Sequence, residues 1–219
     1  MTTFALPELV DALAKHRLVP VVVLDDARDA EPLAEALIAG GLPVAEVTLR
    51  TPAALESIAI MARDPNMLVG AGTVVRPDDV ARVVDAGARF VVSPGFSPAV
   101  VRECQRLGVP ALPGIATATE MQMAVDAGVD TVKFFPASAA GGPAMVKALA
   151  APFTEARFVP TGGVDESNLA SYLAIPSVLA VGGSWMVARK LVASHDFATV
   201  TSLTEQACAA VQALDRKTL

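Results

Sequence analysis

Lys133 is a single charge inside an otherwise apolar segment. The segment 131–136 reads TVKFFP and is typical of a β-strand that ends at proline, so Lys133 and Phe135 would project from the same face. Lysine is seldom buried, and burial disfavours its charged form. A neutral amine can attack a carbonyl carbon and form a Schiff base, which makes Lys133 a candidate nucleophile. The alternative is a lysine at a strand end whose ammonium group stays in solvent.

A carboxylate and a guanidinium share one face of another strand-like segment. In 44–50, which reads VAEVTLR, Glu46, Thr48 and Arg50 alternate with apolar residues. The apolar set is expected to pack on helices, which directs Glu46 and Arg50 to the other side of the sheet. The two could simply form a buried ion pair. Beside a lysine carried on a strand, however, Glu46 is better interpreted as a catalytic proton-transfer group.

Other candidates follow the expected ends of further strands. Thr73 ends the third apolar segment, and Pro94 lies in the Ser-Pro-Gly sequence that follows the fourth. Phe135 lies two residues beyond Lys133, where it could wall a pocket or simply pack in the core. These positions matter because polar groups at the carboxyl ends of parallel strands meet at one edge of a sheet.

Two glycine pairs follow the last two expected strands, in Thr161-Gly162-Gly163 and in Gly182-Gly183-Ser184. Glycines let backbone N–H groups approach an anion, and a helix starting after each loop would add a favourable dipole. One such pair is common in loops, but two at these places indicate a phosphate site. We expect Asp165 to cap the helix after the first pair.

Metal and cofactor chemistry find no support in the residue pattern. Neither His16 nor His195 ends an expected strand, and no group of His, Asp and Cys residues has the spacing of metal ligands. No Ser–His pair is suggested either. We expect no metal and no cofactor.

The elements that must position these residues alternate regularly. Eight apolar segments, spaced 20 to 26 residues apart, begin near Val19, Val44, Leu68, Phe90, Ala111, Thr131, Arg157 and Val178, with helical patterns between them. This alternation predicts an α/β fold with a parallel sheet, and eight units fit a (β/α)8 TIM barrel preceded by an extra helix over 6–16. An open doubly wound sheet is the alternative, but it would favour a glycine fingerprint after the first strand. We expect one domain over 1–219.

Helix boundaries carry recognisable signals. Thr51 and Ser97 each precede a proline and are expected to be caps, and Thr117 with Glu120 forms a capping box. Glycines at 41, 87, 108 and 128 are expected to end helices.

Composition excludes several classes of function. The 219 residues are 53% hydrophobic with a net charge of −6, which argues against binding nucleic acid or anionic membranes but permits an anionic substrate in a local pocket. Cys104 and Cys208 fall at apolar helical positions, as expected for reduced core residues of a cytoplasmic protein. The first 18 residues lack an apolar signal core, and 167–188 is too interrupted to be a membrane span.

Several motifs together resemble the class I 2-keto-3-deoxy-6-phosphogluconate (KDPG) and 4-hydroxy-2-oxoglutarate aldolase family. The likeness extends from about Val19 to Trp185, and the matching segments are 46–51 (EVTLRT), 69–74 (VGAGTV), 93–95 (SPG), 132–137 (VKFFPA), 160–163 (PTGG) and 182–185 (GGSW). The resemblance implies a cytoplasmic homotrimer of the Entner–Doudoroff pathway that releases pyruvate and glyceraldehyde 3-phosphate.

The resemblance also implies a role for each candidate residue. Lys133 would be the Schiff-base nucleophile and Glu46 the general acid and base, while the substrate would contact Arg50, Thr73, Pro94, Phe135, Thr161, Gly162, Gly163, Gly183 and Ser184. Arg50 and Thr73 would hold the pyruvate carboxylate, and Thr161 and the glycine loops the hydroxylated, phosphorylated end. Some relatives place a basic residue after the first strand. Leu24 and Asp25 stand here, so this loop is assigned no phosphate contact.

Three alternatives remain open from the residues. The same lysine could cleave the galactonate epimer or 4-hydroxy-2-oxoglutarate. A phosphate-binding isomerase or epimerase would instead use metal ligands or form no imine. A sugar-phosphate sensor would keep the pocket without turnover. Retention of both Lys133 and Glu46 argues against the sensor.

Overall fold

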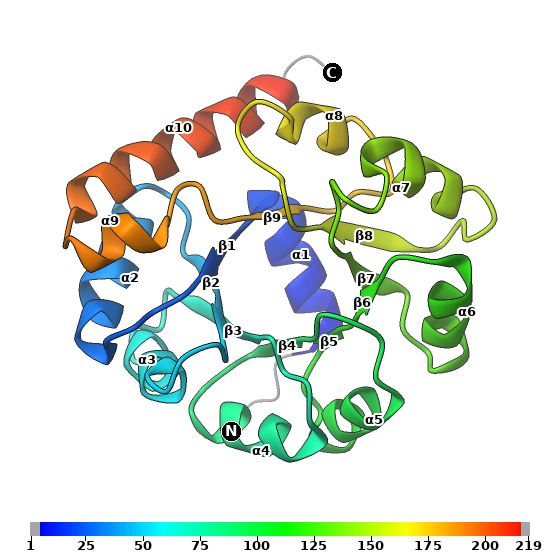
Figure 1. The fold of residues 1–219 in the computed structure, drawn as a ribbon, viewed down its shortest axis with the longest axis horizontal. Helices are drawn as coiled ribbons and strands as arrows, with labels where there is room; N and C mark the ends of the chain where they lie inside the picture. Colours follow the sequence, from blue (N-terminus) through cyan, green and yellow to red (C-terminus); the bar gives the residue numbers. More distant parts are fainter. Residues whose placement is uncertain (1–4, 216–219) are drawn as a thin grey trace.

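Parallel strands stand around a common centre and helices cover them on the outside (Figure 1). The computed structural model describes residues 5–215. The strands are β1 (Leu18–Val22), β2 (Val44–Thr48), β3 (Leu68–Gly72), β4 (Phe90–Val92), β5 (Ala111–Leu112), β6 (Gly114–Ile115), β7 (Thr131–Phe134), β8 (Arg157–Pro160) and β9 (Val181–Gly183). The helices are α1 (Leu6–His16), η1 (Ala27–Asp29), α2 (Ala30–Ala39), α3 (Ala54–Met61), α4 (Pro77–Asp85), α5 (Pro98–Leu107), α6 (Ala118–Asp126), α7 (Gly142–Ala150), α8 (Leu169–Leu173), α9 (Arg189–Ala193) and α10 (Phe197–Asp215).

The strands form two parallel sheets rather than the single ring that the sequence pattern predicted. One sheet has the order β5-β4-β3-β2-β1-β9, and the other has the order β6-β7-β8. Pro113 separates β5 from β6 because proline has no N–H to donate to a ladder. Between β8 and β9 only isolated bridges form, from Phe158 to Val178 and from Thr161 to Gly182. The fold is therefore α/β with curved parallel sheets.

Most predicted boundaries agree with the structure. The N-terminal helix spans Leu6–His16 as expected, and Ser97 accepts a hydrogen bond from the Val100 N–H as a helix cap should. The capping box of Thr117 and Glu120 is confirmed. The last predicted strand begins at Val181 instead of near Val178, where only an isolated bridge to Phe158 forms.

The prediction for Thr51 was wrong. The helix α3 begins only at Ala54, and its cap position is Ala53. The Thr51 hydroxyl instead donates to the carbonyl of Leu24, which ties the loop after β2 to the loop after β1.

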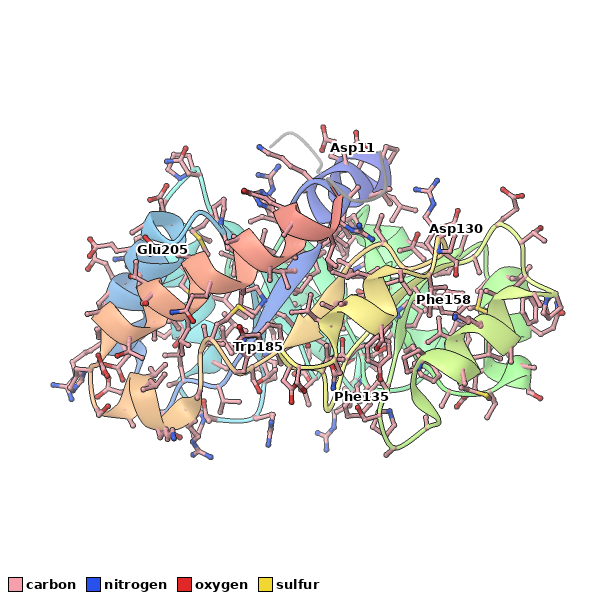
Figure 2. The ribbon with its side chains drawn as sticks, turned by 90° about the horizontal axis from the view of Figure 1, so that it is seen from above. Asp11, Asp130, Phe135, Phe158, Trp185 and Glu205 are labelled. Atoms are coloured by element: carbon pink, nitrogen blue, oxygen red, sulfur yellow. The ribbon has the colours of Figure 1, made fainter. Side chains whose placement is uncertain are left out.

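The two ends of the ring of strands differ. Helix α1 buries Leu9 and Leu13 completely against one end, which stabilises the fold by about 2 kcal/mol for each side chain. Figure 2 shows α1, which carries Asp11, on the side opposite Phe135 and Trp185. The amino-terminal end is thus closed by a helix, and the carboxyl ends of the strands are left to form a pocket.

Two further expectations from the sequence concerned the positions of the cysteines and the question of a membrane-spanning helix. Cys104 is fully buried in α5, where burial raises the pKa of its thiol to about 12, while Cys208 on α10 is half-buried. Within residues 5–215, no helix is long and apolar enough to cross a membrane.

Candidate active site

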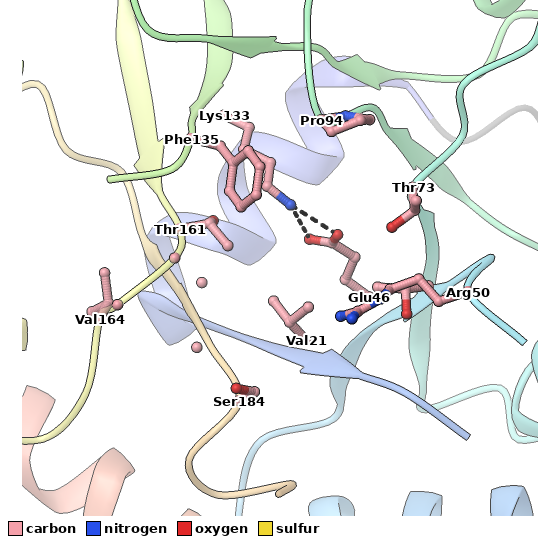
Figure 3. Close-up of a pocket in the computed structure, with 15 residues that line it drawn as sticks. Val21, Glu46, Arg50, Thr73, Pro94, Lys133, Phe135, Thr161, Val164 and Ser184 are labelled. Carbon is pink, nitrogen blue, oxygen red and sulfur yellow. Dashed lines mark hydrogen bonds and ion pairs between the residues drawn. The ribbon is translucent and has the colours of Figure 1, made fainter. Parts of the chain in front are cut away.

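A pocket of about 380 Å³ lies at the carboxyl ends of the strands (Figure 3). All the residues that the sequence singled out line it: Glu46, Arg50, Thr73, Pro94, Lys133, Phe135, Thr161, Gly162, Gly163, Gly183 and Ser184. They come from β2, β7 and β9 and from the loops that follow β2, β3, β4, β7, β8 and β9. Parallel strands bring these separate segments to one edge of the sheets, as expected for a site of this kind.

The amine of Lys133 and the carboxylate of Glu46 meet at the floor of the pocket. The Nζ atom lies 3.0 Å from Oε1 and 3.4 Å from Oε2 of Glu46. The side chains are 8% and 4% exposed, so both charged groups are largely shielded from water. Their positions follow from strand alternation, because Val132 and Phe134 are fully buried on the opposite face of β7.

Two groups contact the amine of Lys133. One is the carboxylate of Glu46, and the other is the ring of Phe135, whose centroid lies 5.2 Å from Nζ. A direct proton transfer from Nζ to Glu46 would convert this ion pair into a neutral amine and a neutral acid. Neutral groups lose less on burial than charged ones, so the pair can supply a nucleophile without releasing a proton to solvent.

Gly72 provides the space that the Glu46 carboxyl occupies. Strand β3 pairs with β2 in a register that sets Gly72 beside Thr48. A Cβ at Gly72 would overlap Oε1 of Glu46. The sequence analysis missed this role, since a glycine at a strand end gives no sign of which side chain it admits.

One end of the pocket is cationic. Arg50 lies just after β2, exposed, and its guanidinium has no acceptor among the described side chains. The alternative of a Glu46–Arg50 ion pair is not realised, because Glu46 pairs with Lys133. Thr73 on the same side has a φ of 58°, which is strained for a β-branched residue. In Figure 3, Arg50 and Thr73 lie on one side of the pocket, and Thr161 and Ser184 lie on the other.

The other end of the pocket presents backbone N–H groups. Gly162 and Gly163 have φ values of 98° and 73°, a conformation that favours glycine. The N–H groups of Gly163 and Val164 donate to no acceptor among the described residues, whereas the bridge between Thr161 and Gly182 turns the Gly162 N–H toward β9. Successive free N–H groups of this kind form an anion-binding concavity.

The helix-dipole part of the prediction for this end was wrong. The following helices begin only at Leu169 and Arg189 and are five residues long each. Asp165 does not occupy the cap position, which belongs to Asn168; its carboxylate instead accepts from the N–H of Ser167 in the preceding turn. Free N–H groups, not helix ends, thus provide the attraction for an anion.

Two lining residues, Val21 and Val164, were not named from the sequence, and two others, Thr48 and Gly182, were named within motifs without a role of their own. Thr48 shares the inward face of β2 with Glu46, as alternation indicated, and its hydroxyl donates to the carbonyl of Val22 at 2.8 Å. Val21 carries no polar signal that sequence could show. Among the described residues, no group of three or more His, Cys, Asp or Glu side chains is placed to hold a metal ion.

The fold and the pocket define an α/β enzyme whose site is built around a buried lysine–glutamate pair. Comparison with known proteins identifies the family. A sequence model of the family described as "KDPG and KHG aldolase" matches residues 9–203, so the chain belongs to this family. It is 51% identical over 199 residues to a 2-dehydro-3-deoxy-phosphogluconate aldolase of Treponema pallidum, covering 90% of this chain and 95% of the relative.

Two further relatives extend the comparison. The KHG/KDPG aldolase of Escherichia coli K12 is 42% identical over 191 residues, covering 87% of this chain and 90% of the relative. The crystal structure of KDPG aldolase from Legionella pneumophila, with pyruvate captured as a covalent carbinolamine intermediate, is 41% identical with a TM-score of 0.88. It covers 90% of this chain and 97% of that one.

Proposed function

We propose that this protein is a class I aldolase that cleaves KDPG into pyruvate and glyceraldehyde 3-phosphate through a Schiff base on Lys133. The observation that carries the proposal is the buried contact of 3.0 Å between Lys133 Nζ and Glu46 Oε1 inside a pocket of substrate size. An amine and a proton-transfer group in direct contact are what imine chemistry requires. Family membership supports the same reaction.

The two ends of the pocket support one orientation of the substrate. Arg50 can hold the carboxylate next to the C2 ketone bidentately, with the Thr73 hydroxyl beside it. The phosphate at the far end then meets the free N–H groups of Gly163 and Val164 and the Gly183–Ser184 loop. In this pose Thr161 lies next to the hydroxylated carbons, and Phe135 and Pro94 shield the reacting centre from water.

The reaction begins with formation of the imine. Neutral Lys133 attacks C2, and the resulting carbinolamine loses water after Glu46 returns a proton to the departing hydroxyl. The C4 hydroxyl then loses its proton, and the C3–C4 bond breaks. Its electron pair moves through C2 to the protonated imine, which gives a neutral enamine and releases glyceraldehyde 3-phosphate. Protonation of C3 and hydrolysis of the imine release pyruvate and restore Lys133. Glu46 is placed to carry these protons, directly or through water.

A second substrate class is supported by the family itself. The matching family model covers KHG as well as KDPG aldolases, and the Escherichia coli relative bears both names. We propose that 4-hydroxy-2-oxoglutarate is cleaved by the same lysine, with its second carboxylate at the anion-binding end. The galactonate epimer of KDPG is the competing substrate. Thr161 favours the gluconate-derived form, because the Thr161 hydroxyl can contact the sugar chain.

Pyruvate release tests the proposal. KDPG, its galactonate epimer and 4-hydroxy-2-oxoglutarate are each supplied, and pyruvate is detected with lactate dehydrogenase and NADH. We expect the highest kcat/KM with KDPG and none of the activity in Lys133→Ala. Preference for the epimer would overturn the substrate assignment, and binding without release of pyruvate would point to a sensor.

We also propose that the chain forms one domain over 1–219, of which residues 1–4 and 216–219 lie outside the described structure, and that its two sheets close as a (β/α)8 barrel. Two observations support closure: a single residue, Pro113, lies between β5 of one sheet and β6 of the other, and a bridge joins Thr161 to Gly182. A cytoplasmic homotrimer is proposed as its assembly, and the exposed apolar side chains of Val75, Met123 and Val125 would suit contacts between chains.

A further inference from the structure

The carbonyl groups around the first glycine pair are all held by hydrogen bonds. Ala137 N–H donates to the carbonyl of Thr161 at 2.8 Å, and Ser138 N–H donates to that of Gly162 at 3.0 Å. The carbonyl of Gly163 accepts two bonds from side chains, from Ser138 Oγ at 2.7 Å and from Asn168 Nδ2 at 2.8 Å.

These bonds determine where the free N–H groups point. In a trans peptide the carbonyl of one residue and the N–H of the next lie in one plane and point in opposite directions. Fixing the carbonyls of Thr161, Gly162 and Gly163 therefore fixes the directions of the N–H groups of the next three residues. The first of these, on Gly162, faces Gly182 of β9, and the N–H groups of Gly163 and Val164 are free. The first two planes are held by backbone donors, so only the third, which carries the Val164 N–H, depends on side chains.

The two side-chain donors are themselves oriented. Asn168 Oδ1 accepts from the Asp165 N–H at 3.1 Å, which leaves its Nδ2 facing Gly163. Ser138 Oγ lies 3.4 Å from the hydroxyl of Tyr172, a fully buried side chain of α8. A Cβ at Gly163 would lie 2.6 Å from Ser138 Oγ, so glycine is needed there for the serine to reach its acceptor.

We propose that Ser138 and Asn168 are positioning residues that make the pocket selective for a phosphorylated substrate. They clamp the Gly163 carbonyl and so hold the Val164 N–H toward the anion. This inference rests on the proposed function for the identity of the substrate. Neither residue lines the pocket, so each acts through the backbone and not by contact with the substrate.

The test compares Ser138→Ala, Asn168→Ala and the double variant on KDPG and on its unphosphorylated analogue. The double variant should lose the hydrogen bond from the Val164 N–H to the charged phosphate. Its KM for KDPG should therefore rise about tenfold. Its kcat should stay within about twofold, and kcat/KM for the unphosphorylated analogue should not change. Ser138→Thr keeps the hydroxyl, and the residue is exposed, so this variant should restore the wild-type KM.

A matched control is Ser194→Ala, which removes an exposed hydroxyl that donates to the Leu191 carbonyl at 3.1 Å, outside the set of pocket residues. It should leave both substrates unaffected. Equal losses on both substrates in the double variant, or an unchanged KM for KDPG, would overturn the inference.

Calorimetric titration with inorganic phosphate makes the inference testable apart from catalysis. The double variant should bind phosphate about tenfold more weakly than wild type even if KDPG were not the substrate. Equal phosphate affinity would refute the clamp. Failure of the wild type to release pyruvate would count against the proposed reaction alone.

Discussion

At the scale of single residues, the protonation state of one ion pair governs the chemistry. Lys133 and Glu46 are both more than nine-tenths buried and lie within hydrogen-bond distance. A buried ion pair contributes little net stability, because the loss of hydration offsets most of the Coulomb attraction. The pair is therefore better explained by the proton that it can pass internally than by stability. The strain at Thr73 in the same pocket fits the same view.

Replacement of Glu46 by glutamine tests this role. Glutamine keeps the size of the side chain but cannot take the proton from the amine, so we expect Glu46→Gln to bind pyruvate while turnover falls by about 100-fold or more. Steady-state kinetics and pyruvate titration measure the two effects. Glu35→Gln alters an exposed carboxylate on α2 and serves as the control. Undiminished turnover would remove Glu46 from the mechanism.

At the scale of elements, the site depends on how neighbouring strands fit together. The alternation of faces was readable from sequence, and it correctly directed Glu46 and Lys133 inward on β2 and β7. What alternation could not show was contact between strands. Gly72 and Glu46 are far apart in sequence, and so are Ser138 and Gly163, yet each pair is in contact through the fold. Helix starts after the glycine loops were misplaced for a similar reason, since local signals did not show the long turns before α8 and α9.

The close fit of β3 against β2 gives a prediction at this scale. A methyl group at Gly72 would displace the Glu46 carboxyl, so Gly72→Ala should lower kcat by about tenfold or more while the far-ultraviolet circular dichroism stays unchanged. In Gly95→Ala the added methyl group meets no atom within 4 Å, so activity should be kept. Wild-type kcat in Gly72→Ala would show that the carboxyl is not held by this strand.

At the scale of the whole molecule, spacing along the chain predicted the order of strands and helices but not how the sheets divide. The regular repeat of apolar segments reports local structure, whereas the division into sheets depends on single residues such as Pro113, which interrupts a ladder. The apolar segments also gave the α1 boundary because Leu9 and Leu13 repeat at helical spacing and are buried. Contacts between copies of the chain produce no comparable repeat in a sequence, so this pattern does not predict the assembly.

The proposed assembly has a direct measurement. Sedimentation equilibrium at several concentrations should give three times the 22.5 kDa mass of the chain. Replacing the exposed Val125 of α6 by aspartate is expected to weaken association only if that surface lies between chains. A mass of one or two chains at all concentrations would contradict the trimer.

The central claim is that the buried amine of Lys133 condenses with a ketone. Treating the protein with pyruvate and borohydride reduces any imine to a stable secondary amine, which mass spectrometry of the peptides locates. The account predicts added mass on Lys133 and none on Lys147, an exposed lysine of α7. Label on another lysine, or no label on a protein that still releases pyruvate, would contradict it.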